Sequence, residues 1–167
     1  TTRPVLDTSG YSHRIAEADV YDSHDYTQDP MVFAERHAGL ADEAPFLNAR
    51  QPDRESGNDG TISIPYGGQP YFVSEFGGIW WNPDAKPGED SWGYGERVKS
   101  LDEFYARFEG LFNVLLDDPK MFGYCYTQLT DVYQEQNGIY TFDRREKFDL
   151  DRIRAIQQRR AAIEKAE

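Results

Sequence analysis

The chain has 167 residues and a formal charge of −12, from 18 Lys and Arg against 30 Asp and Glu. This balance, with an isoelectric point near 4.6, excludes the basic face of a nucleic-acid-binding protein, so we expect no nucleic-acid partner. The 3 Trp, 11 Tyr and 10 Phe exclude an acidic disordered tail, and no apolar run approaches the roughly 18 residues of a membrane span, so no membrane partner is expected either.

The predicted elements alternate between strands and helices. In chain order they are a strand at 4–6, a strand at 18–21, a helix from Asp29-Pro30 through His37, a strand at 71–76, a helix at 101–116, a strand at 121–126 and a helix at 149–165. The helix at 101–116 has the clearest pattern, because apolar residues recur at helical spacing behind a Ser100/Glu103 capping box. This order predicts an α/β fold with about four parallel strands.

Polar or aromatic residues follow each predicted strand. They are Asp7-Thr8-Ser9, Ser23-His24-Asp25-Tyr26, Glu75-Phe76-Gly77-Gly78 and Thr127-Gln128-Leu129-Thr130-Asp131. Parallel α/β proteins place their chemistry at the carboxyl ends of the strands, so the four clusters predict one shared cleft. A doubly wound sheet fits this pattern too, but no phosphate-binding loop follows any of the strands, which favours a barrel.

Glu75 is the first candidate for catalysis. It closes the apolar run Pro70-Tyr71-Phe72-Val73, where an acid is costly unless it is paired, hydrogen-bonded or functional. Gly77 and Gly78 then permit a sharp turn and a close approach of a ligand to the backbone. A structural carboxylate that pairs with an Arg or caps the next element explains the same residues equally well.

Candidate ligand contacts surround Glu75 in the sequence. Trp80 and Trp81, with Trp92 and Tyr94, occupy the loop after it and predict aromatic platforms for sugar rings, or else loop packing against the fold. His24, Asp25 and Tyr26 offer a titratable ring, a carboxylate and a phenol at one strand end. Gln128 ends the last strand, where an amide recognises hydroxyls or satisfies loop backbone groups.

The remaining chemistry-bearing residues predict little further function. Cys125, within a strand expected to be buried, is interpreted as a small core residue, and the single cysteine fits a reducing, cytoplasmic compartment, with secretion left open because the true N-terminus is absent. The three histidines show no paired metal spacing, and no nucleotide-binding glycine motif occurs. We therefore expect neither a metal nor a cofactor.

Four segments in order resemble glycoside hydrolase family 2, the β-galactosidase and β-glucuronidase clan of (β/α)8 barrels. The segment at 70–78 resembles the nucleophile strand of that family. The segments at 2–10, 19–26 and 123–138 are similar to the stretch past the acid/base strand, to the next barrel strand, and to the last strand with its loop. The resemblance implies that residues 1–167 are the C-terminal half of a TIM-barrel catalytic domain whose N-terminal half is missing.

The resemblance also implies a role for particular residues. Glu75 becomes the nucleophile of a retaining β-glycosidase that hydrolyses O-glycosidic bonds of carbohydrates. His24 and Tyr26 become contacts to the sugar or to that carboxylate, and Trp80 and Trp81 become sugar platforms.

The chain departs from the family pattern in its second carboxylate. Retaining hydrolysis needs two carboxyl groups about 5 Å apart. The family's acid/base is a Glu in an Asn-Glu pair, and no such pair occurs in this sequence. We therefore expect the acid/base to lie outside this chain and the chain alone to be inactive.

Two further expectations concern the partners and the alternative function. A half-barrel leaves a sheet edge exposed, which favours self-association or pairing with the missing half. The alternative function is a non-catalytic carbohydrate-binding or scaffolding protein that keeps the barrel sequence.

Overall fold

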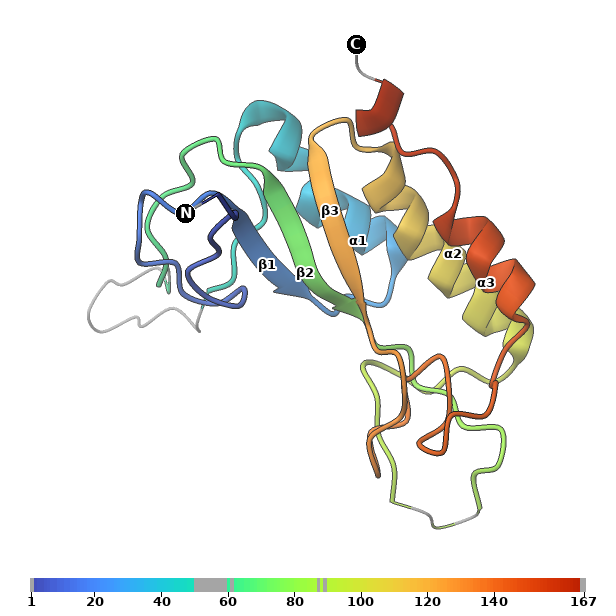
Figure 1. The fold of residues 1–167 in the computed structure, drawn as a ribbon. Coiled ribbons are helices and arrows are strands. Elements are labelled where there is room, and N and C mark those ends of the chain that lie inside the picture. Colours follow the sequence, from blue (N-terminus) through green and yellow to red (C-terminus); the bar gives the residue numbers. More distant parts are fainter. Residues whose placement is uncertain (1, 50–59, 61, 87, 89, 166–167) are drawn as a thin grey trace.

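The computed structural model describes residues 2–49, 60, 62–86, 88 and 90–165 of the chain. Three parallel strands form one sheet in the order β1-β2-β3, and helices connect and cover them (Figure 1). In chain order the elements are β1 (Tyr21–Asp25), α1 (Pro30–His37), the 3₁₀ helix η1 (Ala38–Asp42), β2 (Tyr71–Gly77), α2 (Leu101–Asp117), β3 (Met121–Thr127), α3 (Leu150–Gln157) and the 3₁₀ helix η2 (Ile163–Lys165). The predicted parallel α/β arrangement is confirmed.

Local capping explains where the helices begin. The Asp29 carboxylate accepts hydrogen bonds from the backbone N–H groups of Met31 and Val32, and Pro30 occupies the first turn of α1. Ser100 caps α2 by accepting from the backbone N–H of Glu103. Both helix starts agree with the sequence prediction.

The strand predicted at 4–6 is wrong. Val5 instead bonds with Asp19, through its carbonyl to the Asp19 N–H (2.9 Å) and through its N–H to the Asp19 carboxylate (2.8 Å). These bonds close a loop, so three strands replace the expected four in the part of the chain that the structure describes. Both β1 and β3 are then edge strands, and closure into a barrel stays a prediction.

Three further expectations need correction. The strand predicted at 18–21 overlaps β1 only at Tyr21, because β1 continues through the polar residues 22–25, which pair with β2 and of which all but His24 are buried. The helix predicted at 149–165 ends at Gln157, and the chain forms only the short η2 after it. Cys125 is exposed rather than buried, because none of the helices and strands that the structure describes covers this part of β3.

A bulge in β2 sets the direction of Glu75. Ser23 pairs with Val73 while the next residue, His24, pairs with Glu75, so one extra residue lies in β2 at this point. The pairing with β3 shifts in the same place, between Val73 and Phe76. Val73 and Phe76 are both fully buried in the hydrophobic core although they are three residues apart. The extra residue thereby frees the Glu75 side chain from the core.

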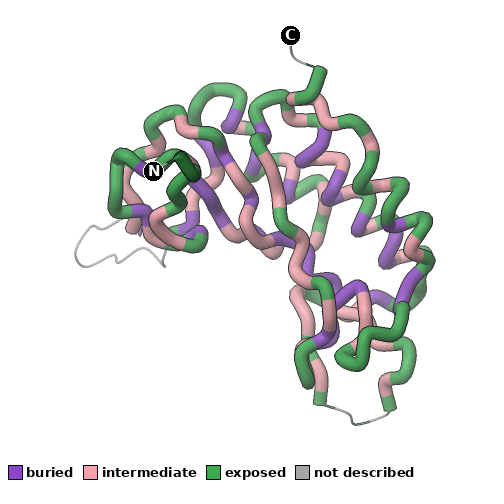
Figure 2. The backbone as a smooth tube through the Cα atoms, in the orientation of Figure 1, coloured by how far each residue is buried: buried purple, intermediate pink, exposed green. Residues whose placement is uncertain are grey.

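The hydrophobic core lies between the sheet and the helices. Helices α1, α2 and α3 lie on one side of the sheet (Figure 1), and aromatic rings fill the space between the layers. Phe76 of β2 contacts Phe112 of α2 and Phe33 of α1 at ring-centroid distances of 5.1 and 6.1 Å. Along β3, intermediate and exposed residues follow the buried Met121, so this strand is covered only in part (Figure 2).

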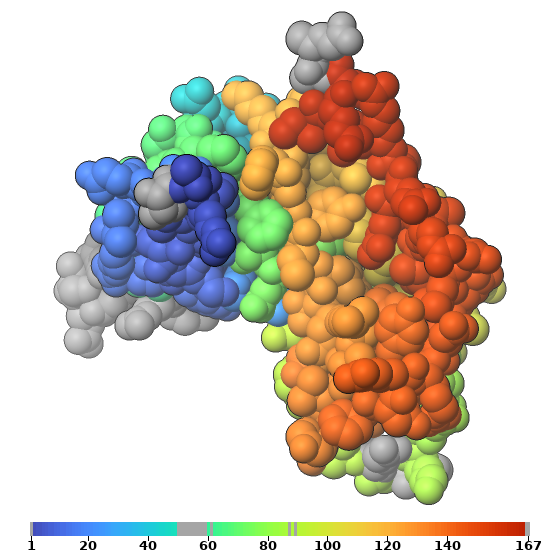
Figure 3. Space-filling view, viewed as in Figure 1, coloured from blue at the N-terminus to red at the C-terminus, as the bar shows by residue number. Residues whose placement is uncertain are grey.

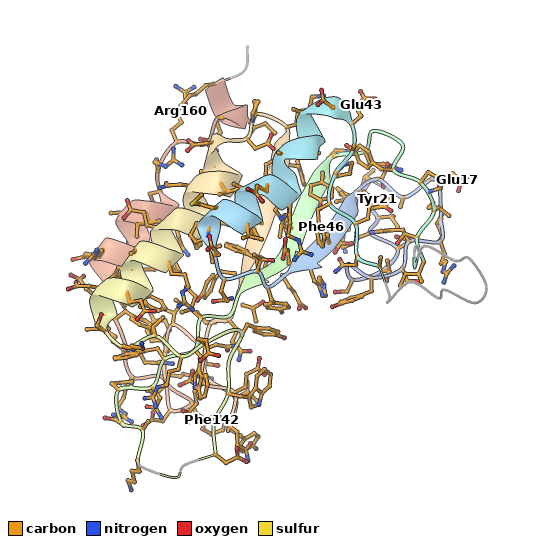
Figure 4. All side chains as sticks on the ribbon, turned by 180° about the vertical axis from the view of Figure 1, so that it is seen from behind. Glu17, Tyr21, Glu43, Phe46, Phe142 and Arg160 are labelled. Atoms are coloured by element: carbon orange, nitrogen blue, oxygen red, sulfur yellow. The ribbon has the colours of Figure 1, made fainter. Side chains whose placement is uncertain are left out.

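The loops after β2 and β3 fold together into a lobe below the strand ends (Figure 1). Backbone bridges join Ile79 to Tyr94 and Trp92 to Glu135. A buried ion pair between Lys147 and Asp131, at 2.8 Å, ties the second loop to the segment before α3. Figure 4 shows the lobe from behind, with the exposed Phe142 on it. None of the helices described has the length and apolar character needed to cross a membrane.

Candidate active site at the carboxyl ends of the strands

The carboxyl ends of the three strands bring the predicted polar residues to one edge of the sheet. His24 of β1 is the cross-strand partner of Glu75, and Gly77 of β2 is the partner of Thr127 in β3. The N-terminal segment lies on one side of this edge and the lobe of loops on the other, and the surface between them is hollowed (Figure 3).

The Glu75 carboxylate is held by two side chains from the end of β1. The Tyr26 hydroxyl donates a hydrogen bond to Oε2 of Glu75 at 2.5 Å. Nδ1 of His24 lies 3.3 Å from the same oxygen. The Glu75 side chain is nevertheless 40% exposed, so a carboxylate fixed on one side stays open to a ligand on the other. The structure thus brings together His24, Tyr26 and Glu75, as the sequence predicted.

Tyr26 is itself fixed from two further directions. Its hydroxyl lies 3.2 Å from Oγ1 of Thr127, at the end of β3. Its ring stacks on Tyr94, with centroids 3.4 Å apart and an interplanar angle of 5°. Burial, together with the hydrogen bond to Glu75, raises the pKa of Tyr26, so the phenol keeps its proton and remains a donor.

Two glycines turn the chain directly after Glu75. Gly77 and Gly78 have φ angles of +80° and +60°, which side chains rarely adopt. A Cβ on Gly77 would overlap the ring of Tyr126, and one on Gly78 would overlap the ring of Tyr94. The amide of Gln28 donates to the carbonyl oxygens of Gly77 (2.5 Å) and Tyr26 (3.0 Å) and so fixes the two strand ends together.

Asp25 takes no part in this arrangement. Its side chain is 1% exposed, and Oδ2 lies 3.2 Å from Nε2 of His37 and 3.3 Å from Nε of Arg36, both in α1. Burial by itself raises the pKa of Asp25, but the contacts from His37, Thr27 and Arg36 outweigh it and leave the pKa below its usual value. The predicted substrate contact is therefore replaced by a structural one, because the carboxylate links β1 to α1 and does not reach solvent.

Gln128 lies beside the site and joins it to the loop after β3. Its amide donates to Oδ1 of Asn137 at 2.7 Å, and the amide of Asn137 donates to Glu135 at 3.2 Å. A cis peptide bond joins Gln128 to Thr127. The partly exposed Glu135 is a carboxylate of this loop that the sequence did not single out.

The tryptophans divide into two groups. Trp80 packs against Arg97, with the guanidinium carbon 6.0 Å from the ring centroid, and Trp81 packs against the hydrophobic core. The contacts of the described residues link neither of them to Glu75. Trp92 is 45% exposed and contacts Tyr94 edge to face at 5.8 Å, which places it in a continuous aromatic series with Tyr26.

Three residues that the sequence did not assign as ligand or catalytic contacts of their own hold the site. Ser9 bonds His24, Gln28 fixes the glycine turn, and Tyr94 stacks on Tyr26. Ser9 and Tyr94 do lie in clusters that the sequence marks as polar or aromatic. Gln28 carries no signal, because the bond that ties it to the glycine turn goes to the backbone oxygen of Gly77, 49 positions away. In the described part of the chain, no group of three His, Cys, Asp or Glu side chains is arranged to hold a metal ion.

Comparison with known proteins gives a weak structural likeness. No protein-family model matches the sequence, and no curated protein matches it. Among solved structures, a β-glucuronidase of Faecalibacterium prausnitzii is similar over 86% of this chain, with 17% identity and a TM-score of 0.45. The chain spans 22% of the length of that protein. A likeness at this level does not establish a common fold or a common activity.

Proposed function

We propose that the chain is part of a retaining β-glycosidase of the family 2 type, with Glu75 as its nucleophile. The observation that carries this proposal is the presentation of Glu75 at the carboxyl end of a parallel strand, fixed by Tyr26 and His24 and open on its other side. A nucleophilic carboxylate must be oriented toward the carbon that it attacks, and contacts from two side chains to one oxygen fix its orientation.

The proposed reaction proceeds in two displacements. The Glu75 carboxylate attacks the anomeric carbon as the bond to the leaving oxygen breaks, and an acid outside this chain protonates that oxygen. Water then attacks the glycosyl ester, gives up a proton to the same outside group, and releases the sugar and the Glu75 carboxylate. Tyr26 stays protonated throughout and holds the carboxylate in place.

The experiment uses a 2-deoxy-2-fluoro glycoside with a fluoride or dinitrophenolate leaving group. Such a leaving group departs without a proton, so the missing acid does not prevent the first displacement. We expect the chain to gain the mass of one fluorosugar and peptide mapping to place it on Glu75. Glu75→Gln, nearly the same in size, is the matched control and should not be labelled.

A non-catalytic carbohydrate-binding protein is the second candidate. It is favoured by the absence, among the residues that the structure describes, of a second carboxylate bonded to any of the groups that hold Glu75. Saturable sugar binding without labelling supports this candidate over the first. A label on another residue overturns the assignment of Glu75, and neither binding nor labelling overturns both functions.

A further inference from the structure

His24 is held at both ring nitrogens and along its backbone. Nδ1 faces Oε2 of Glu75 at 3.3 Å, and Nε2 lies 3.0 Å from the hydroxyl of Ser9. Asn48 bonds the backbone on both sides, accepting from the His24 N–H and donating to the His24 carbonyl oxygen, each at 2.8 Å. The ring therefore has one partner for each nitrogen and little freedom to exchange them.

The segment that carries Ser9 also packs against the ring itself. A Cβ on Gly10 would overlap the His24 imidazole, so the backbone lies directly against it, and the φ angle of +70° suits a glycine. Tyr11 contacts the same ring edge to face, with centroids 5.2 Å apart. These contacts block a flip of the imidazole about its Cβ–Cγ bond.

A buried group of three side chains holds this segment on β1. His13 lies between two carboxylates, with Nδ1 2.7 Å from Asp7 and Nε2 3.0 Å from Asp22, and the three side chains are 1%, 2% and 0% exposed. Asp22 also accepts from the backbone N–H of Gly10 at 2.9 Å. The residue next to Ser9 is thus bonded to the same carboxylate that faces His13, so the position of Ser9 depends on this buried group of three side chains.

We propose that Ser9 is a positioning residue that keeps an N–H of His24 on the Glu75 carboxylate in both protonation states of the ring. A hydroxyl both donates and accepts. When His24 is charged, Ser9 accepts from Nε2–H. When His24 is neutral, Ser9 donates to Nε2, and the remaining ring proton stays on Nδ1, where it faces Glu75. The consequence for the nucleophile rests on the proposed function, but the fixed tautomer does not.

Nitrogen NMR of the 167-residue chain labelled with ¹⁵N-histidine tests this directly. Long-range proton–nitrogen correlations identify which ring nitrogen carries the proton once a pH titration has made His24 neutral, and loss of a signal in His24→Gln assigns the residue. We expect neutral His24 to carry its proton on Nδ1 alone. Ser9→Ala should shift most of the population to the Nε2–H form, and Ser9→Thr, which restores a hydroxyl, should return it to Nδ1–H.

Ser12→Ala is the control, because Ser12 accepts from Nε of Arg14 and has no bond to His24. It should leave the His24 signals unchanged. A wild-type ring protonated on Nε2, or a Ser9→Ala ring that keeps the Nδ1–H form, overturns the proposal. The readout needs neither sugar nor turnover. A chain that fails to be labelled at Glu75 but shows the expected tautomers therefore contradicts the glycosidase function alone.

Discussion

The hydroxyl of Tyr26 donates to Oε2 of Glu75 at 2.5 Å, across 49 positions of sequence. The two residues meet because β1 and β2 are adjacent parallel strands, so their carboxyl ends lie at the same edge of the sheet. The phenol is buried enough to keep its proton, and the carboxylate is exposed enough to meet a ligand. This relationship distinguishes Glu75 from a structural carboxylate whose oxygens are all turned inward.

Tyr26→Phe should slow labelling of Glu75 by the activated fluorosugar about 10- to 100-fold. A hydrogen bond to a charged group contributes about 1.5–3 kcal/mol, and the variant leaves the carboxylate with His24 as its remaining partner in the bonds described. The rate is measured by intact mass against time. Tyr66→Phe, which removes a bond of the same kind to the Gln69 carbonyl, is the control. Equal labelling rates in both variants would contradict a role for Tyr26.

Gly77→Ala should lower the free energy of unfolding by about 2–4 kcal/mol. The backbone at position 77 has a φ of +80°, which strains any residue with a side chain, and the new methyl group also overlaps the partly buried ring of Tyr126. Gly68→Ala separates these effects, since Gly68 has a φ of +88° but no atom within 4 Å of an added Cβ, and it should cost about 1 kcal/mol. Urea unfolding measures the free energy of both variants. Similar losses would show that the Tyr126 ring moves aside for the methyl group at no extra cost.

Asp25→Asn should make the free energy of unfolding fall less steeply as the pH is lowered. The pKa of Asp25 is lower in the folded chain than its usual value of 3.8, so its contribution is fully present above that pH. The contribution is lost as the pH falls through the lowered folded value. Unfolding by urea between pH 6 and pH 2 should therefore show a steeper decline in the wild type than in Asp25→Asn. Asp42→Asn, at an exposed residue of η1, should keep the wild-type slope.

Trp92→Ala should weaken oligosaccharide binding about 3- to 10-fold with little change in stability. The ring is 45% exposed and continues the aromatic series that begins at Tyr26, and an aromatic contact contributes about 0.5–1.5 kcal/mol. Trp81→Ala should instead destabilise the fold, because that ring packs against the core. Calorimetric titration with sugar and thermal unfolding separate the two outcomes. Weaker binding only in Trp81→Ala would contradict the role of Trp92 and assign the sugar platform to Trp81, as predicted from the sequence.

The sequence by itself determined the class of fold and the position of the central carboxylate. The 101–116 helix was predictable because its cap and its apolar spacing are local, and it forms as α2. Glu75 was predictable as unusual because an acid closes an apolar run before two glycines. The meeting of the carboxyl ends of β1 and β2 at one edge of the sheet was predictable, because adjacent parallel strands end at the same edge.

Only the tertiary structure decided how Glu75 and the residues around it are oriented. Strict alternation from the buried Val73 would point the Glu75 side chain into the core, and the bulge in β2 turns it outward instead. A bulge depends on pairing with the neighbouring strands. The same holds for Asp25, which reads as a ligand in sequence and is buried against α1 in the fold. Ser9 reaches His24 because a buried histidine between two aspartates holds its segment in place. Contacts between distant segments fixed these side chains, and no local pattern encodes them.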